Sequence, residues 1–285
     1  MLAVWGAAGL GRTVADKPSI SALLIAGAPI SLIATSALTP DLPLLACSLS
    51  GVHLLTRTAR PMDQRWVGAL LLGTASLFRY SGVALIVLAP LWPLLHDDRR
   101  AAVKLGLLAA TPVSLLFIHD IVAYGQIHML SMMAFQSTSN EWIDISHKAI
   151  ATLAALGGVA ALPILTWSRP QSAVIGTLVG ASLSGLATLF FDFGTPFWTA
   201  VIFGAAGGAS FAACFRKRDA TDTFLTVWIL LGFVFLLALR FSAARYWLPF
   251  FAPAILIPLR DACLLYTSDA ADEGLGVDLG GRRII

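Results

Sequence analysis

Two arginines before the last apolar run of the chain are the residues best placed to do chemistry. Arg245 begins the sequence Arg-Tyr-Trp-Leu-Pro at the head of the apolar run 246–259, and Arg240 lies five residues earlier. A charge at the mouth of a membrane helix is costly unless it reaches water or an anionic partner. Guanidinium binds phosphate through paired hydrogen bonds. Arg240, Arg245 and the neighbouring Tyr246 therefore predict a site for a phosphate-bearing lipid.

A third arginine and an aspartate extend this set. Arg79 interrupts an apolar stretch, either in a turn between two short spans or as a charged point inside one longer helix. Both arrangements place a cation near the outer face, where a lipid phosphate is a natural counter-ion. Asp41 lies in Thr-Pro-Asp-Leu-Pro, where the prolines hold it on a rigid turn. It could orient a sugar, a metal or a lysine, but residue chemistry alone favours a helix N-cap.

The sequence pattern for a metal cofactor is weaker than the pattern for a lipid phosphate. Glu141, Asp144 and His147 have the i, i+3, i+6 spacing of one helical face, and three such side chains can hold a divalent cation. A solvated loop face explains the same spacing and is the favoured interpretation. No cofactor is assigned, and a divalent metal stays open. The chain has no P-loop, GxGxxG, GxSxG or HExxH motif, so nucleotide-driven transport and the common hydrolase schemes gain no support.

The composition indicates a helical membrane protein. The 285 residues are 58% hydrophobic and 12% charged, with a mean hydropathy of +0.82, whereas soluble domains are about 25% charged. We expect an all-α, polytopic transmembrane bundle of about ten spans. The apolar segments lie near 19–38, 42–56, 66–78, 81–95, 101–122, 148–166, 172–191, 197–213, 223–239 and 246–259. Segments 66–78 and 81–95 are short and are either two spans or one broken helix.

The tail 263–285 differs from the rest of the chain. It contains four of the 16 acidic residues, whereas the first 262 residues contain a single glutamate, Glu141. Its sequence, from Cys-Leu-Leu-Tyr-Thr-Ser-Asp-Ala-Ala-Asp to the closing Val-Asp-Leu-Gly-Gly-Arg-Arg-Ile-Ile, resembles the in-frame translation of a transposase-type sequencing-library adapter. Such a segment is excluded from fold reasoning. We expect a non-native tail that does not fold, after a membrane domain at 1–262 that is truncated at both ends.

The distribution of basic residues predicts the orientation of the chain. If the N-terminus is cytoplasmic, 13 of the 17 basic residues before the tail fall on the inner side, which is a strong positive-inside bias. The four on the outer side are Arg79, Lys148, Arg240 and Arg245. Two interpretations remain open for these four, namely ordinary solvated charges or a functional group of cations.

The order of these features resembles the GT-C fold of membrane glycosyltransferases, in the branch of protein mannosyltransferases and lipid A aminoarabinose transferases. The segment 36–44 is similar to the family's segment in which an acidic residue precedes a span. The segment 70–88 resembles its apolar stretch broken by Lys-Tyr-x-Gly, with Arg79 in place of the lysine. The segment 244–249 resembles its late Arg-Tyr-Leu-Leu-Pro motif.

The resemblance implies transfer of a sugar from a polyprenyl-phosphate donor to a lipid, glycan or protein acceptor outside the cytoplasm. It implies a multi-pass protein of a cell inner membrane, with membrane lipids around it and no nucleic-acid partner. The family's general base lies upstream of the position where Met1 aligns, so the catalytic residue is unknown here and this fragment is expected to be inactive. By the same resemblance Arg79, Arg240, Arg245 and Tyr246 bind the donor's lipid phosphate, with Asp41 as a supporting acidic residue.

Two other classes of protein remain as alternatives. A multi-span transporter or flippase for an anionic lipid or solute should show paired halves with matching broken helices, and no such repeat is visible. In a membrane protein without catalysis, Asp41, Arg79, Arg240 and Arg245 should scatter around the bundle. In the glycosyltransferase they should converge on one cavity near the outer leaflet.

Overall fold

The chain folds entirely into helices within the residues that the structure describes. A computed structural model describes residues 1–36, 39–57, 62–136, 142–167, 171–190, 196–215, 219–239 and 244–260. Every regular element in these ranges is an α-helix or a 3-10 helix, which confirms the predicted all-α class. Arg240, Glu141 and the tail 263–285 lie outside the described residues, as does the side chain of Asp144.

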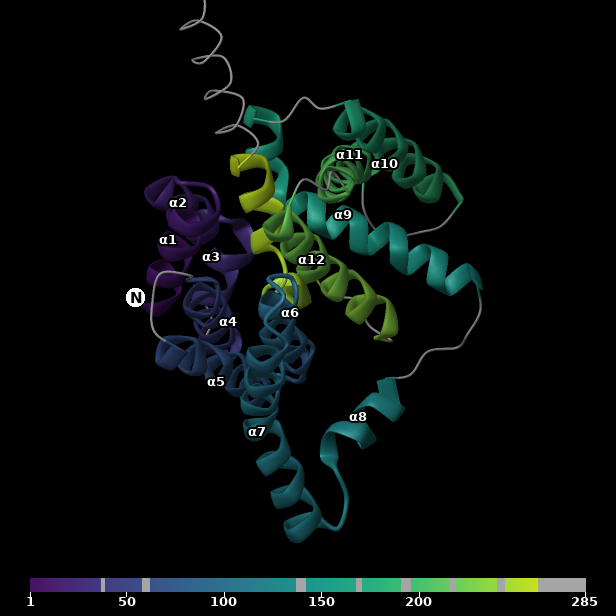
Figure 1. Cartoon of the computed structure of the whole chain (residues 1–285). Helices are drawn as coiled ribbons and strands as arrows, with labels where there is room; N and C mark the ends of the chain where they lie inside the picture. The colour runs from purple at the N-terminus through teal and green to yellow at the C-terminus, as the bar shows by residue number, and fades with distance from the viewer. Residues whose placement is uncertain are drawn as a thin grey trace, which may run out of the picture.

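The helices follow the apolar segments of the sequence closely (Figure 1). In chain order they are α1 (Leu2–Val14), α2 (Pro18–Gly27), α3 (Pro29–Ser36), α4 (Asp41–Thr56), α5 (Met62–Phe78), η1 (Tyr80–Val87), α6 (Leu88–Leu94), α7 (Arg99–Tyr124), α8 (His128–Gln136), α9 (Trp142–Trp167), α10 (Gln171–Phe190), α11 (Phe197–Cys214), α12 (Ala220–Ala238) and η2 (Ala244–Trp247). A last helical segment covers 252–260.

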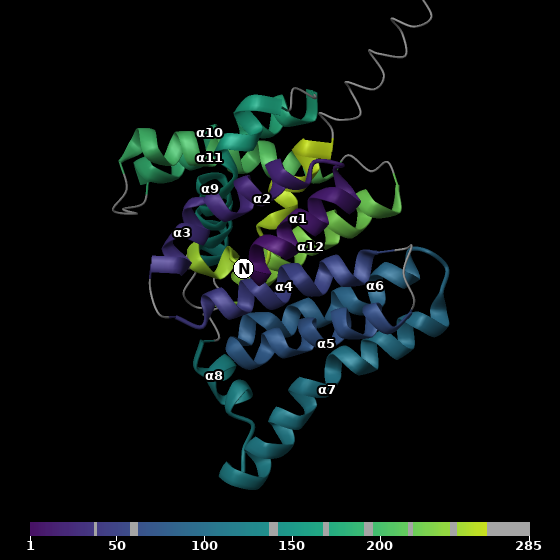
Figure 2. The same ribbon diagram turned by 90° about the vertical axis from the view of Figure 1, so that its left-hand side faces the viewer.

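The helices form two groups with the last part of the chain between them. Helices α4 to α7 pack together on one side, and α9, α10 and α11 pack together on the other (Figures 1 and 2). Helix α12 and the segment 244–260 pass through the middle. The C-terminal half of α7 and the short α8 project away from both groups. The chain end that carries Arg245 is thus positioned where the two groups meet.

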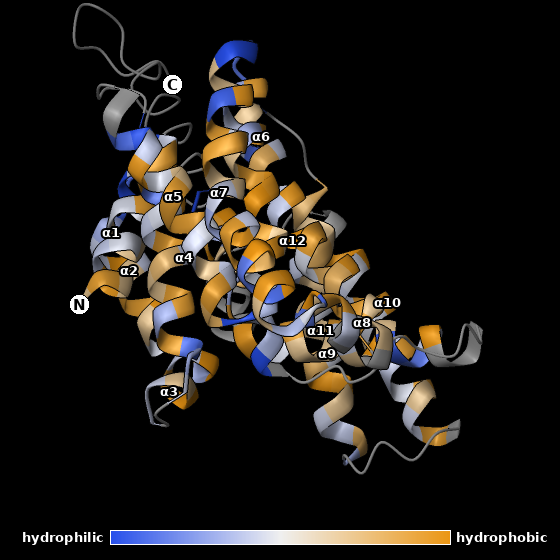
Figure 3. Ribbon diagram, turned by 90° about the horizontal axis from the view of Figure 1, so that it is seen from below, coloured by the Kyte–Doolittle hydropathy of each residue, from blue (hydrophilic) through white to orange (hydrophobic). Residues whose placement is uncertain are grey.

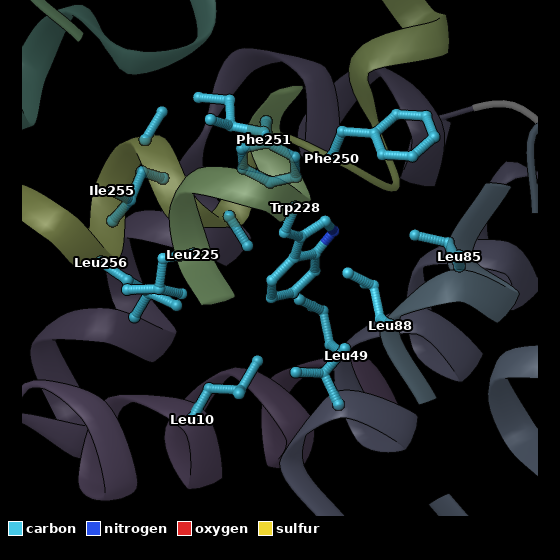
Figure 4. Packing of buried hydrophobic residues seen from close by; sticks show 14 of the residues in the cluster. Leu10, Leu49, Leu85, Leu88, Leu225, Trp228, Phe250, Phe251, Ile255 and Leu256 are labelled. Carbon is cyan, nitrogen blue, oxygen red and sulfur yellow. The ribbon is translucent and has the colours of Figure 1, made fainter. Parts of the chain in front are cut away.

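The last apolar run forms the core of the molecule, which corrects the prediction that 246–259 is a membrane span. All residues from Trp247 to Leu259 are buried, and Phe250, Phe251, Ile255 and Leu256 belong to the same hydrophobic cluster as Trp228 of α12 (Figure 4). A segment that is apolar on every side suits a protein interior as well as a lipid environment. The described helix in this run covers only 252–260, which is well short of the roughly 20 residues that a span needs.

The predicted number of spans was also wrong. The described residues contain three helices long and apolar enough to cross a membrane: α7, α11 and α12. A fourth is possible if α2 and α3, which meet at a 60° bend, count as one span. Several of the other apolar segments form shorter helices, such as the 16 residues of α4, which at 1.5 Å per residue reach about 24 Å of a hydrocarbon core roughly 30 Å thick. Hydrophobic residues nevertheless make up much of every helix group, as the colouring in Figure 3 shows.

The chain breaks at Arg79, and segments 66–78 and 81–95 are separate elements. Helix α5 ends at Phe78, and Arg79 has an extended backbone with φ −151° and ψ 146°. The 3-10 helix η1 then folds back along α5. Gly82 permits this close approach, because a Cβ there would lie 2.4 Å from the backbone of Ala75. The break leaves the Arg79 side chain at the junction of the two elements.

An ion-pair network connects the last segment to the start of α12. Arg260 contacts the carboxylates of Asp219 and Asp222, and its hydrogen bond with Asp219 lowers the pKa of that carboxyl to about 2. Asp219 is also the N-cap of α12, because its carboxylate accepts from the backbone N–H of Asp222. The network fixes one end of the buried segment 252–260.

The lowered pKa of Asp219 predicts a dependence of stability on pH. The ordinary pKa is 3.8 and the folded value is about 2, so the ion pair stabilises the fold fully above pH 4 and loses this effect as the pH falls towards 2. Between pH 5 and pH 2 the melting temperature in detergent should fall more for the native chain than for Asp219→Asn, which keeps a good N-cap residue. If the melting temperatures of the native chain and of Asp219→Asn fall equally over this pH range, the ion pair contributes nothing to stability.

Helices α10 and α11 pack through glycines. A Cβ at Gly180 of α10 would lie 2.1 Å from the carbonyl oxygen of Gly204, and one at Gly208 would lie 2.1 Å from that of Gly176. Small residues let helix backbones approach closely in apolar surroundings. This contact holds α10 and α11 together as a rigid wall.

Gly180→Ala should therefore lower the free energy of unfolding by about 1–3 kcal/mol, the usual cost of overpacking. Gly27→Ala is the matched control, because a Cβ there meets nothing within 4 Å and alanine favours helix. Tryptophan fluorescence during thermal unfolding measures both. Equal stability of the two variants would contradict the close packing of α10 on α11.

Candidate functional site

Asp41 and Arg79 form an ion pair across 38 residues of sequence. Nε of Arg79 lies 2.5 Å from Oδ1 of Asp41, and Nη2 donates a hydrogen bond of 3.2 Å to Oδ2. The angle at Nε is too poor for a hydrogen bond, so the Nη2 bond carries the directional part of the contact. The side chain of Asp41 is 7% exposed and that of Arg79 is 18% exposed. This is a largely buried pair, with the guanidinium held by one of its two edges.

The position of Asp41 corrects the expectation of an N-cap. Pro40 is the N-cap residue of α4, and no side chain caps this end. Asp41 is the first residue of the helix, where the dipole favours a negative charge. Its Oδ2 also accepts a hydrogen bond of 3.1 Å from the hydroxyl of Thr39. The start of α4 therefore holds the carboxylate, and the carboxylate holds Arg79 at the α5–η1 break.

Tyr246 lies between two arginines. The guanidinium carbon of Arg79 lies 5.9 Å from the centre of the Tyr246 ring, and that of Arg245 lies 5.5 Å from it. Cations are attracted to the faces of aromatic rings at such distances. Asp41, Arg79, Arg245 and Tyr246 thus come together from three separate segments, and we call them the arginine–tyrosine cluster.

Two tryptophan side chains fix the backbone that carries the cluster. The indole N–H of Trp247 donates to the carbonyl of Thr152 on α9 at 3.0 Å, and that of Trp228 donates to the carbonyl of Pro249 at 2.9 Å. Both tryptophans are fully buried. Gly232 of α12 leaves space for this segment, since a Cβ there would lie 2.5 Å from Phe250. Arg245 is therefore held next to α9 by Trp247, two residues further along the chain.

An apolar cavity begins beside Arg245. Its volume is about 520 Å³, and it is lined by residues of α3, α9, α10 and α11. Within the described residues, Arg245 is the one charged side chain in its lining. Four of the six α9 residues in the lining are small, namely Ala151, Ala154, Ala155 and Gly158; the other two are Ile150 and Val159. The cavity is thus an apolar space with a single cation at its edge.

The two cations of the cluster differ in how their charge is compensated. Asp41 compensates Arg79, whereas in the part of the chain that the structure describes no carboxylate pairs with Arg245, which is exposed. An anionic ligand would therefore gain most from Arg245. Arg79 still has Nη1 available, since no described residue accepts a hydrogen bond from it.

The structure thus brings together four of the five residues that the sequence singled out. Arg240 lies outside the described residues. The described ranges contain no group of three metal-ligating side chains, but Glu141 and the side chain of Asp144 are not among them. Sequence reasoning missed the cavity and the tryptophan anchors. The small residues at 151, 154, 155 and 158 recur at helical spacing and were the available signal for the cavity wall.

Comparisons with protein-family models, with curated proteins and with solved structures find no match for this chain. The fold and site define an all-α protein with candidate membrane-spanning helices and a positively charged cluster, partly buried, beside an apolar cavity.

The buried ion pair predicts strong coupling between Asp41 and Arg79. Arg79→Gln leaves the Asp41 carboxylate buried without its partner and should cost about 3 kcal/mol, the low end of the range for such pairs. Adding Asp41→Asn to this variant removes the stranded charge and should recover most of the loss. Unfolding titrations in mixed micelles measure the wild type, both single variants and the double variant. Additive effects of the two substitutions would contradict the coupling.

Proposed function

We propose that this chain is part of a membrane glycosyltransferase of the GT-C type and binds a polyprenyl-phosphate-linked sugar. The arginine–tyrosine cluster is the site for the phosphate, and the cavity beside it takes the adjacent part of the polyprenyl chain. The observation that carries the proposal is the position of Arg245. It belongs to the cluster and also lines the apolar cavity.

A lipid phosphate has the two chemical properties that this arrangement needs. Its anionic head can pair with Arg245, which has no described carboxylate partner. Its hydrocarbon chain can displace water from a lining that is almost wholly apolar. A soluble anion would use the cation alone, and a neutral lipid would use the cavity alone.

The size of the cavity supports a partial fit of the lipid chain. Ligand cavities usually measure about 300–1,000 Å³, and this one is near 520 Å³. The small side chains of α9 widen it, and the glycine contacts between α10 and α11 hold the opposite wall in place. The part of a long polyprenyl chain beyond the cavity would lie in the surrounding membrane.

In such an enzyme the cluster would act by electrostatic stabilisation. Breaking the sugar–phosphate bond adds negative charge to the leaving phosphate, and a fixed cation in water-poor surroundings stabilises that charge strongly. Arg245 supplies the cation, while Asp41 holds Arg79 close to Tyr246, the ring that Arg245 also approaches. The proposal places the acceptor, which is a lipid, glycan or protein, outside the cytoplasm at an inner membrane. The group that activates the acceptor is not among these residues.

Binding of decaprenyl phosphate to the purified chain in neutral detergent tests the proposal. Arg245→Gln should weaken binding by about tenfold or more, because a hydrogen bond to a charged group contributes roughly 1.5–3 kcal/mol. Ala154→Phe, which fills the cavity, should weaken binding of decaprenyl phosphate but not of inorganic phosphate. Native mass spectrometry measures the bound fraction.

Arg100→Gln is the matched control, since Arg100 is an exposed arginine at the start of α7. If Arg245→Gln and Arg100→Gln weaken binding equally, the lipid is held by general charge attraction and the proposed site is wrong. A second assay separates the transferase from a flippase. Transbilayer movement of a labelled polyprenyl phosphate in liposomes, if it depends on Arg245, would favour the transporter.

A further inference from the structure

The carboxylate in the cluster needs an explanation beyond holding Arg79. Asp41 brings a negative charge to a site that attracts an anion, and it lies 2.5 Å from the guanidinium of Arg79. It therefore reduces the net charge of the cluster from +2 to +1. A glutamine, whose amide oxygen could also accept a hydrogen bond from Arg79, would not have this effect. The carboxylate is buried, at 5% exposure, so water and salt screen it less than a surface charge.

We infer that Asp41 lowers the affinity of the site more for a lipid phosphomonoester, which carries nearly two negative charges, than for a lipid phosphodiester, which carries one, and so shifts its selectivity towards the phosphodiester. The inference rests on the proposed function and adds a specificity-determining residue to it. Each negative charge on the ligand is attracted by Arg245 and Arg79 and repelled by Asp41. The repulsion therefore counts once for a diester and almost twice for a monoester.

This selectivity has a consequence for the transfer reaction. The bond between the sugar's anomeric carbon and the phosphate oxygen breaks, and the acceptor hydroxyl oxygen bonds to that carbon. The proton of the hydroxyl leaves to a base, and the phosphate departs as a monoester with one more negative charge. Donor and spent carrier thus differ at the atoms that the cluster contacts. Asp41 weakens the binding of the product, the polyprenyl phosphate monoester, and favours its release.

The ionisation of the ligand provides a readout that a purely structural role of Asp41 would not change. The second pKa of a phosphate monoester is about 6. Above that pH the monoester has nearly two charges, and well below it the monoester and the diester both have one. Discrimination by charge should therefore be present at pH 8 and lost at pH 5, while a steric preference would persist.

The experiment compares decaprenyl phosphate with a glycosyl decaprenyl phosphodiester on the full chain in neutral detergent. At pH 8, Asp41→Asn should tighten monoester binding by roughly threefold to thirtyfold more than diester binding, as expected for the repulsion of one extra ligand charge by a nearby carboxylate. At pH 5 the same substitution should affect both lipids equally. Asp97→Asn is the control, because it removes the same charge from an exposed turn.

The possible outcomes separate this inference from the proposed function. If both lipids bind in an Arg245-dependent way and Asp41→Asn leaves their affinity ratio unchanged at pH 8, the inference is overturned and the lipid site stands. If Asp41→Asn weakens both lipids equally, Asp41 only positions Arg79, and the inference is again overturned. If neither lipid depends on Arg245, the proposed function itself fails.

Discussion

The ion pair between Asp41 and Arg79 is the interaction on which the arrangement of the site depends. It is largely buried in a protein with few charges, where an unpaired guanidinium would be costly. The pair connects the start of α4 to the break between α5 and η1, and it holds Arg79 beside the ring of Tyr246. Without it, Arg79 would have to turn towards solvent, and Tyr246 would lose one of its two cationic neighbours.

The second constraint is the burial of the chain segment that carries Tyr246. The indole N–H of Trp247 donates to the carbonyl of Thr152 on α9, and that of Trp228 donates to the carbonyl of Pro249. The residues from Trp247 to Leu259 are buried. Arg260 then closes the segment against α12. A segment fixed at both ends holds Arg245 in one place at the edge of the cavity. Fixed charges of this kind need little rearrangement when a ligand binds.

The sequence predicted the helical elements well because apolar runs bounded by charge, proline or glycine are a local signal. It also picked out the residues of the cluster, since an arginine in apolar surroundings is conspicuous by its cost. It did not predict which runs would face lipid and which would be buried. The run 246–259 has the composition of a span, but its burial depends on Trp228 and Leu49, which are distant in sequence. Residue chemistry alone likewise favoured the Asp41 carboxylate as the cap of its own helix. The local sequence does not show its partner Arg79, because the two residues are 38 positions apart.

Photocrosslinking of a lipid bound in the cavity would test the central claim most directly. A photoreactive phenylalanine analogue can replace Phe203, which lines the cavity, or Leu107, which is exposed on α7. With radiolabelled decaprenyl phosphate, the account predicts strong labelling at position 203 that excess unlabelled lipid removes, and weak labelling at position 107 that it does not. Equal labelling at both positions, insensitive to competitor, would contradict a lipid-phosphate site between α3, α9, α10 and α11.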